Sequence, residues 1–110
     1  MAASRRGFGL AAAVEPEVIR GAAQLAEELG YHSFWLNDND QGDGLEGLAQ
    51  AASVTSRIML GVGVIALSRK PAEQIVAHLR QLDGSQGGEV RLPLDRLWLG
   101  VGSGAGGKGA

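Results

Sequence analysis

The sequence predicts an α/β domain built on a parallel sheet, and two observations carry this prediction. Strand-like and helix-like patterns alternate along the chain in the order βαβαβαβ, and right-handed crossovers place such strands side by side with helices against the sheet. A continuous apolar run at residues 58–65 is typical of a parallel strand that is covered on both faces. A chain of 110 residues has room for one hydrophobic core, so a single domain over residues 1–110 is expected.

The first half of the chain is expected to hold two strands and two helices. Residues 7–12 form a short apolar strand, and residues 16–29 form a helix with proline in its first turn and glycine just past its end. The aromatic and apolar residues 31–36 predict a second strand. Asp43 and Glu46 have the spacing of a capping box, so a second helix begins there. Its apolar stripe is Leu45, Leu48, Ala49 and Ala52.

The second half repeats the alternation. Residues 57–67 hold the third strand, Pro71 opens a third helix that stops at Gly84, and residues 97–102 form a fourth strand. The residues of this helix expected to face the core are Ala72, Ile75, Val76, Leu79 and Leu82. Two tryptophans at strand centres, Trp35 and Trp98, are also expected in the core.

Composition excludes several classes of function. A net charge of −2 gives no general attraction to nucleic acid, and the absence of cysteine excludes disulfides and thiolate chemistry. No apolar run approaches the roughly 20 residues of a membrane span. Residues 4–10 resemble a twin-arginine export signal, but the apolar stretch that follows is short, so a first strand and a cytoplasmic protein are expected.

Ligands of parallel α/β sheets bind at the carboxyl ends of the strands, which places function in residues 37–43, 64–70 and 102–109. Asp38 lies nearest to a strand end and is the best candidate for a functional carboxylate. The acidic residues of the first segment are Asp38, Asp40, Asp43 and Glu46. Their oxygens suit a divalent cation, but the spacing lacks the glycine and the bidentate glutamate of a calcium loop. A solvated turn with a helix cap is the favoured alternative.

The glycine-rich end of the chain matches two phosphate-binding patterns incompletely. Gly102, Gly104 and Gly107 fit G-x-G-x-x-G, and Lys108 adds most of a phosphate loop. Glycine stands where that loop needs serine or threonine, and no helix follows. A backbone cradle for a phosphate remains open, as do a flexible tail and a magnesium-dependent nucleotide site.

Four other polar residues allow two interpretations each. His32 and His78 have no carboxylate or second histidine at ligand spacing, so surface or packing roles are favoured over catalysis. Arg69 and Lys70 stand where a strand passes into a helix, and they contact either an anionic ligand or solvent.

Three blocks of sequence resemble the bacterial luciferase-like monooxygenases. They are LGYHSFWLND at 29–38, TSRIMLGVGVI at 55–65 and RLWLGVGSG at 96–104, in the same order as in the family. The resemblance implies a (β/α) barrel oxidoreductase that binds FMN or the deazaflavin coenzyme F-420 at the carboxyl ends of its strands. It implies a phosphate-side cradle at Gly102, Ser103 and Gly104, and a cis peptide bulge behind the ring at Gly63 and Val64.

The resemblance also assigns Asp38 and Asn39 to the catalytic end, facing a small-molecule substrate. Deazaflavin-dependent dehydrogenases of the family often have a histidine after this acid, where this chain has Asn39. An amide takes no proton from an alcohol near neutral pH, so simple alcohol dehydrogenation is disfavoured.

Length sets this chain apart from the family. A complete barrel has eight strands in about 250 residues, whereas four strands are predicted here, forming a partial (β/α) TIM-type barrel with three helices. Both sheet edges are then unpaired. The chain is therefore expected to lack a C-terminal half or to form a homo-oligomer. The alternative function is a non-catalytic module that pairs with another chain through these edges.

Overall fold

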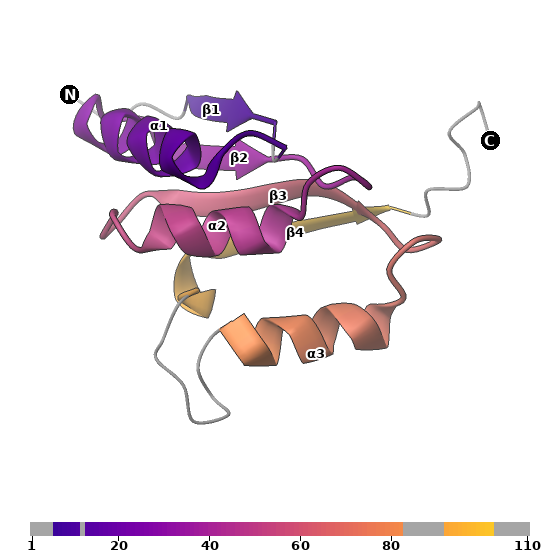
Figure 1. Cartoon of the computed structure of the whole chain (residues 1–110). Helices are drawn as coiled ribbons and strands as arrows, with labels where there is room; N and C mark the ends of the chain where they lie inside the picture. The colour runs from indigo at the N-terminus through magenta and orange to yellow at the C-terminus, as the bar shows by residue number, and fades with distance from the viewer. Residues whose placement is uncertain (1–5, 12, 83–91, 103–110) are drawn as a thin grey trace.

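The computed structural model describes residues 6–11, 13–82 and 92–102. Its elements are β1 (Gly7–Leu10), α1 (Pro16–Glu28), β2 (Ser33–Leu36), α2 (Gly44–Ala52), β3 (Met59–Ala66), α3 (Ala72–Leu82), the 3-10 turn η1 (Leu94–Arg96) and β4 (Leu97–Gly102). The predicted alternation of four strands and three helices is confirmed (Figure 1). The predicted stop of the third helix at Gly84 lies outside the described residues.

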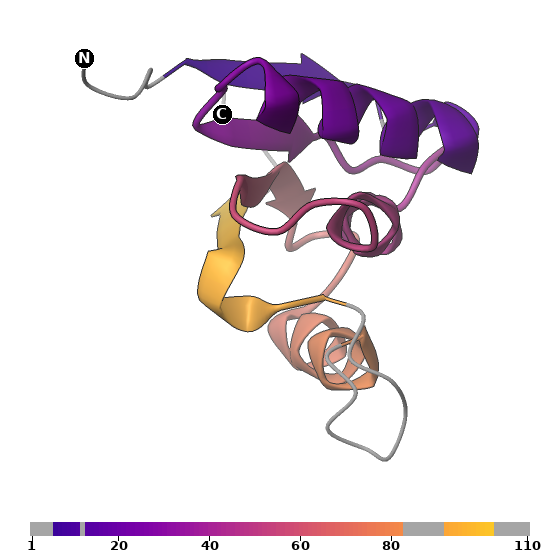
Figure 2. The same ribbon diagram turned by 90° about the vertical axis from the view of Figure 1, so that its left-hand side faces the viewer.

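The strands form one parallel sheet in the order β1-β2-β3-β4. Each crossover leads to the next strand in the same direction, so crossovers of one hand place all helices on one face. The two ribbon views agree that α1, α2 and α3 form a layer on the same side of the sheet (Figure 1, Figure 2). The opposite side, which no described element covers, is called the uncovered face below. The positions on it include Gly7, Ser33, Trp35, Gly61, Val64 and Trp98.

The core lies between the sheet and the helix layer. Residues of β2 and β3 that face the helices, such as Phe34, Leu60 and Val62, have no exposed surface. From the helices, Leu45 and Leu48 are equally buried. Each such side chain stabilises the fold by about 1.5–3 kcal/mol, so the sheet and the first two helices hold most of the stability.

Two packing predictions were wrong. Trp98 is 40% exposed and Trp35 is half-buried, because both point to the uncovered face instead of the core. In α3, Ile75 and Leu82 are buried and Leu79 partly so, whereas Ala72 and Val76 are exposed. That helix is the last of the described layer, so only a narrow stripe of it meets a neighbour (Figure 2).

Candidate functional site

A buried carboxylate joins the carboxyl ends of β2 and β3 on the helix side of the sheet. The side chain of Asp38 has no exposed surface. Its Oδ1 accepts hydrogen bonds from the Gly44 N–H at 2.7 Å and from Lys70 Nζ at 3.2 Å, and its Oδ2 accepts one from Arg69 Nη2 at 2.6 Å. Gly44 is the first residue of α2, so the carboxylate also lies at the positive end of that helix.

The structure shows which groups Arg69 and Lys70 contact. Both pair with Asp38, so neither forms the solvated pair that was one of the two sequence interpretations. Arg69 keeps 34% of its side chain exposed, whereas Lys70 keeps 14%. The two cations tie the β3–α3 loop to the β2–α2 loop.

Asp43 extends the ion-pair cluster of Asp38, Arg69 and Lys70 to the start of α2. Its Oδ1 accepts the Glu46 N–H at 3.0 Å, which confirms the predicted cap, and its Oδ2 lies 3.1 Å from Lys70 Nζ. Burial acts to raise the pKa of the Asp43 carboxyl, but the Glu46 N–H and the Lys70 ammonium outweigh it and hold that pKa below its ordinary value of 3.8.

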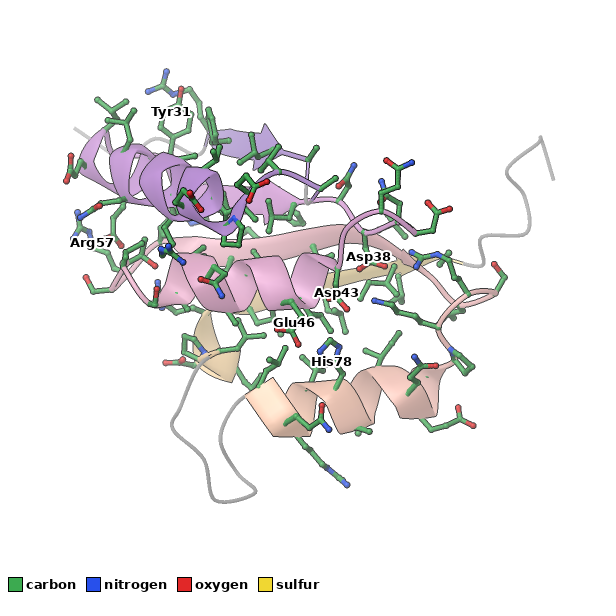
Figure 3. The ribbon with its side chains drawn as sticks, in the orientation of Figure 1. Tyr31, Asp38, Asp43, Glu46, Arg57 and His78 are labelled. Carbon is green, nitrogen blue, oxygen red and sulfur yellow. The ribbon has the colours of Figure 1, made fainter. Side chains whose placement is uncertain are left out.

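His78 has carboxylate partners that sequence spacing did not reveal. Its Nε2 lies 2.9 Å from Glu46 Oε2, and its Nδ1 lies 3.8 Å from Asp43 Oδ2. Figure 3 shows His78 of α3 pointing toward these two residues of α2. The contact links two helices, so the packing role expected for this histidine describes it correctly. A pocket of about 290 Å³ lies beside it, lined by residues of these two helices and by Asp43 and Lys70.

The uncovered face carries a different set of groups at the carboxyl end of β3. The Gly63–Val64 peptide is cis, as predicted, and the pairing of β3 with β4 shifts register between Val62 and Ile65. Val64 is 52% exposed. A Cβ added at Gly102 on the neighbouring strand would lie 3.2 Å from Val64 Cγ1. Glycine therefore leaves open the space beside this valine.

Tryptophan and glycine alternate across the same face. Gly9, Trp35, Gly61 and Trp98 are register partners in that order. The Trp35 ring covers Gly61, where an added Cβ would lie 2.6 Å from Trp35 Cδ2, and the two tryptophan rings are 5.8 Å apart. Trp35 Nε1 donates to Ser33 Oγ at 2.8 Å, which fixes the ring in place. A large ring on one strand thus requires glycine on the next.

The predicted site residues therefore divide between the two sides of the sheet. Asp38 is buried on the helix side, and Asn39 is an exposed loop residue whose Oδ1 accepts the Gln41 N–H at 2.8 Å. Gly63, Val64 and Gly102 lie together on the uncovered face. The other two predicted cofactor residues, Ser103 and Gly104, lie outside the described residues, as do the phosphate-loop matches that follow. Within the described ranges, no group of three or more histidine and acidic side chains could hold a metal ion.

One structural carboxylate was missed by sequence reasoning. Glu27, in the last turn of α1, accepts hydrogen bonds from the N–H groups of Ser56, Arg57 and Ile58 at 2.7–3.2 Å. Burial acts to raise its pKa, but these three backbone bonds outweigh it and hold the pKa below the ordinary 4.5. An acid is disfavoured at a helix C-terminus, and this was the available signal that Glu27 has partners elsewhere.

Comparison with known proteins identifies the family of this chain. The sequence profile of the Luciferase-like monooxygenase family matches residues 1–108. This chain belongs to that family. The fold agrees with a solved structure: that of coenzyme F420 dependent tetrahydromethanopterin reductase from Methanopyrus kandleri superimposes with a TM-score of 0.71 at 25% identity, over 91% of this chain and 27% of that chain.

A curated protein is similar over most of the chain. The uncharacterized protein YwcH of Bacillus subtilis (strain 168) is 32% identical over 80 residues, which are 67% of this chain and 24% of that protein. The chain therefore spans about a quarter of the length of the relatives it matches. Among the described helices, none is both long enough and apolar enough to cross a bilayer. The cytoplasmic location stays a prediction.

Proposed function

We propose that this chain provides the ring-binding wall of a flavin- or deazaflavin-dependent oxidoreductase, with FMN or coenzyme F-420 as its cofactor. The apolar surface at the carboxyl end of β3 carries this proposal, because Val64 is 52% exposed there and Gly102 of the neighbouring strand leaves the space beside it open. Membership of the luciferase-like family and the likeness to an F420-dependent reductase support the same cofactor class.

The described residues fit the planar ring of such a cofactor. A flat ring needs an apolar surface without protruding neighbours, and the glycines at 63 and 102 leave the space next to Val64 without side chains. A Cβ at Gly63 would meet only carbons of the Trp35 ring, at 3.6 Å. The surface beside Val64 is thus aromatic and apolar, as the face of an isoalloxazine or deazaflavin ring requires.

In this proposal each residue of the chain has a positioning task. The cofactor supplies hydride transfer when bound. Val64 would support one face of its ring, and the backbone of Gly102 would hold the phosphate side. Ser103 and Gly104, which lie outside the described residues, are proposed for the same task. Bare backbone can approach an anion more closely than a substituted residue can.

Asp38 is best suited to hold the loops of the site in place. Its carboxylate accepts from three donors and is fully buried, so it fixes the start of α2 and the β3–α3 loop together. A direct catalytic role for Asp38 or Asn39 toward a small-molecule substrate stays a prediction. Of these two side chains, Asn39 is the exposed one, so solvent and substrate can reach it.

The test is a fluorescence titration of the 110-residue chain with coenzyme F-420 and with FMN. We expect saturable quenching of the tryptophan emission, because Trp35 lies beside Gly63. Gly102→Val should raise the dissociation constant about tenfold or more, a loss of about 1.4 kcal/mol, because the new side chain crowds Val64. Gly21→Val is the matched control, since an added Cβ at Gly21 of α1 meets nothing within 4 Å.

The outcome separates this function from its alternative. Within the described residues, β1 and β4 each pair with one neighbouring strand. This and the uncovered face favour a non-catalytic assembly module as the second candidate. A folded chain whose tryptophan emission is quenched by neither cofactor would support the assembly module and contradict the proposed cofactor-binding function. Equal affinity in Gly102→Val and in the parent would reject the placement of the cofactor beside Val64.

A further inference from the structure

We infer that Glu27 and Arg96 are energetically coupled through the peptide group between Thr55 and Ser56, and that this coupling latches the start of β3 to both α1 and β4. Glu27 lies in the last turn of α1, and Arg96 lies in η1, directly before β4. Both side chains bind residues 55–58, the segment that leads from α2 into β3. The two side chains and the peptide group between them are called the relay below.

The carboxylate of Glu27 takes the donors of the segment. Its Oε2 lies 3.0 Å from the nitrogen of Ser56, 2.7 Å from that of Arg57 and 2.9 Å from that of Ile58. Successive N–H groups that converge in this way form a site for an anion. Burial acts to raise the pKa of the Glu27 carboxyl, but these bonds hold that pKa below 4.5, so the group is charged near neutral pH.

The guanidinium of Arg96 takes the acceptors of the same segment. Its Nη1 donates to Ile58 O at 2.8 Å and to Thr55 Oγ1 at 3.3 Å, and its Nη2 donates to Thr55 O at 3.3 Å. A planar fork can reach two carbonyl groups at once, which an ammonium on a flexible stem does less well. The segment thus lies between an anion from α1 and a cation from η1.

One peptide group of the segment is bonded to both charges. The peptide between Thr55 and Ser56 has the Thr55 oxygen, which accepts from Arg96, and the Ser56 N–H, which donates to Glu27. A hydrogen bond at one end of a peptide group polarises it and strengthens the bond at its other end. The two side chains should therefore stabilise the fold together by more than the sum of their separate effects.

The neighbouring peptide groups show where the influence of Arg96 should be felt. The N–H groups of Arg57 and Ile58 also donate to Glu27, but among the described contacts Arg96 bonds to neither of the carbonyl groups in their peptides. The peptide that follows Ile58 does bind Arg96 through its oxygen, and its Met59 N–H donates to His32 O of β2 at 3.1 Å. Arg96 should therefore polarise two of these four amides and not the two between them.

The relay joins the two strands of the proposed site at their amino ends. β3 and β4 pair from Leu60 and Leu97 onward, and they carry Val64 and Gly102 at their other ends. This consequence for the site rests on the proposed function. The coupling of the two side chains does not, because it lies at the opposite end of the sheet and involves no cofactor.

The first experiment is a double-mutant cycle, measured by urea unfolding of the 110-residue chain with Glu27→Gln, Arg96→Gln and both changes together. Either single change breaks the relay, so the folding equilibrium constant of the double variant should fall about threefold or more short of the product of the two single losses. Glu28→Gln replaces Glu27→Gln in the control cycle, because Glu28 is an exposed acid of the same turn, and there the losses should multiply. Losses that multiply in the first cycle as well would overturn the inference.

The second experiment reads the relay at the amide protons by 1H–15N correlation spectra of Arg96→Gln. We expect the amide protons of Ser56 and Met59 to move further upfield than those of Arg57 and Ile58, because only the first two share a peptide with an oxygen that Arg96 binds. Equal shifts at all four would indicate a general loosening of the segment and would reject the relay.

A second variant serves both experiments if Arg96→Gln does not fold. Arg96→Lys keeps the charge but lacks the fork that spans two carbonyl groups, so the coupling and the amide shifts should change in the same directions. A folded Arg96→Lys in which neither changes would also overturn the inference. Cofactor binding enters none of these measurements, so failure here and failure of the proposed function are separate results.

Discussion

At the scale of single residues, charged side chains that lie far apart in the sequence come together when the chain folds. Asp38 follows β2, and Arg69 and Lys70 follow β3. Because these parallel strands are neighbours, their carboxyl ends meet, and Arg69 and Lys70 pair with the buried Asp38. The cluster holds two loops that the proposed site needs in fixed positions.

Replacing the buried carboxylate tests this role. Asp38→Asn keeps the shape and an acceptor for the Gly44 N–H but removes the negative charge that Arg69 and Lys70 face. We expect a loss of about 2–3 kcal/mol in the free energy of unfolding, at the low end for a broken buried pair because Arg69 can reach water. Urea unfolding measures it, and the exposed loop residue Asp40, changed to Asn, is the control. Equal midpoints for both variants would rule out the stabilising role.

At the scale of elements, local chemistry predicted the starts of helices well. The cap of α2 was predictable because Asp43 and Glu46 interact within a few residues of chain. The faces of strands were less predictable. The strand register places Trp35 and Trp98 on one face of the sheet, but alternation within each strand does not predict whether helices cover that face. The partners of Glu27 and His78 come from other elements, so only the folded chain brings them together.

Two helical glycines illustrate how packing decides the effect of the same substitution. An added Cβ at Gly44 would lie 2.8 Å from the Asn37 backbone oxygen and 2.6 Å from Val62 Cγ2. Gly44→Ala should therefore lower the free energy of unfolding by about 1–3 kcal/mol. Gly21→Ala meets open space in the middle of α1 and should raise it by about 0.5–1 kcal/mol. Denaturant midpoints that move in the same direction for both variants would contradict the close packing of α2 on the sheet.

At the scale of the whole molecule, the sheet resembles half of a cylinder, and its two sides hold different groups of side chains. The helix side holds the ion-pair cluster and the core, and the uncovered face holds Val64 and the tryptophans. The residues that stabilise the fold thus differ from those of the proposed cofactor site. The acid response of the fold should consequently depend on the helix side alone.

Two carboxylates should control that response. The pKa values of Glu27 and Asp43 lie below their ordinary values of 4.5 and 3.8. A carboxyl whose pKa is depressed by folding stabilises the fold above its unfolded pKa, and this contribution is lost as the pH falls through the folded pKa. We therefore expect the free energy of unfolding to decline as the pH drops below about 4.5.

The variant Glu27→Gln isolates the contribution of one carboxylate to this fall in the free energy of unfolding at low pH. It removes a charge that accepts three backbone N–H groups ahead of β3, so the variant should be less stable near neutral pH and should lose less stability on acidification. Glu28→Gln, an exposed neighbour in the same turn, should keep the profile of the parent. Urea midpoints measured from neutral to acidic pH give the comparison. Parallel profiles for Glu27→Gln and the parent would mean that the α1 carboxylate does not hold the start of β3, and that acid acts on the fold through other groups.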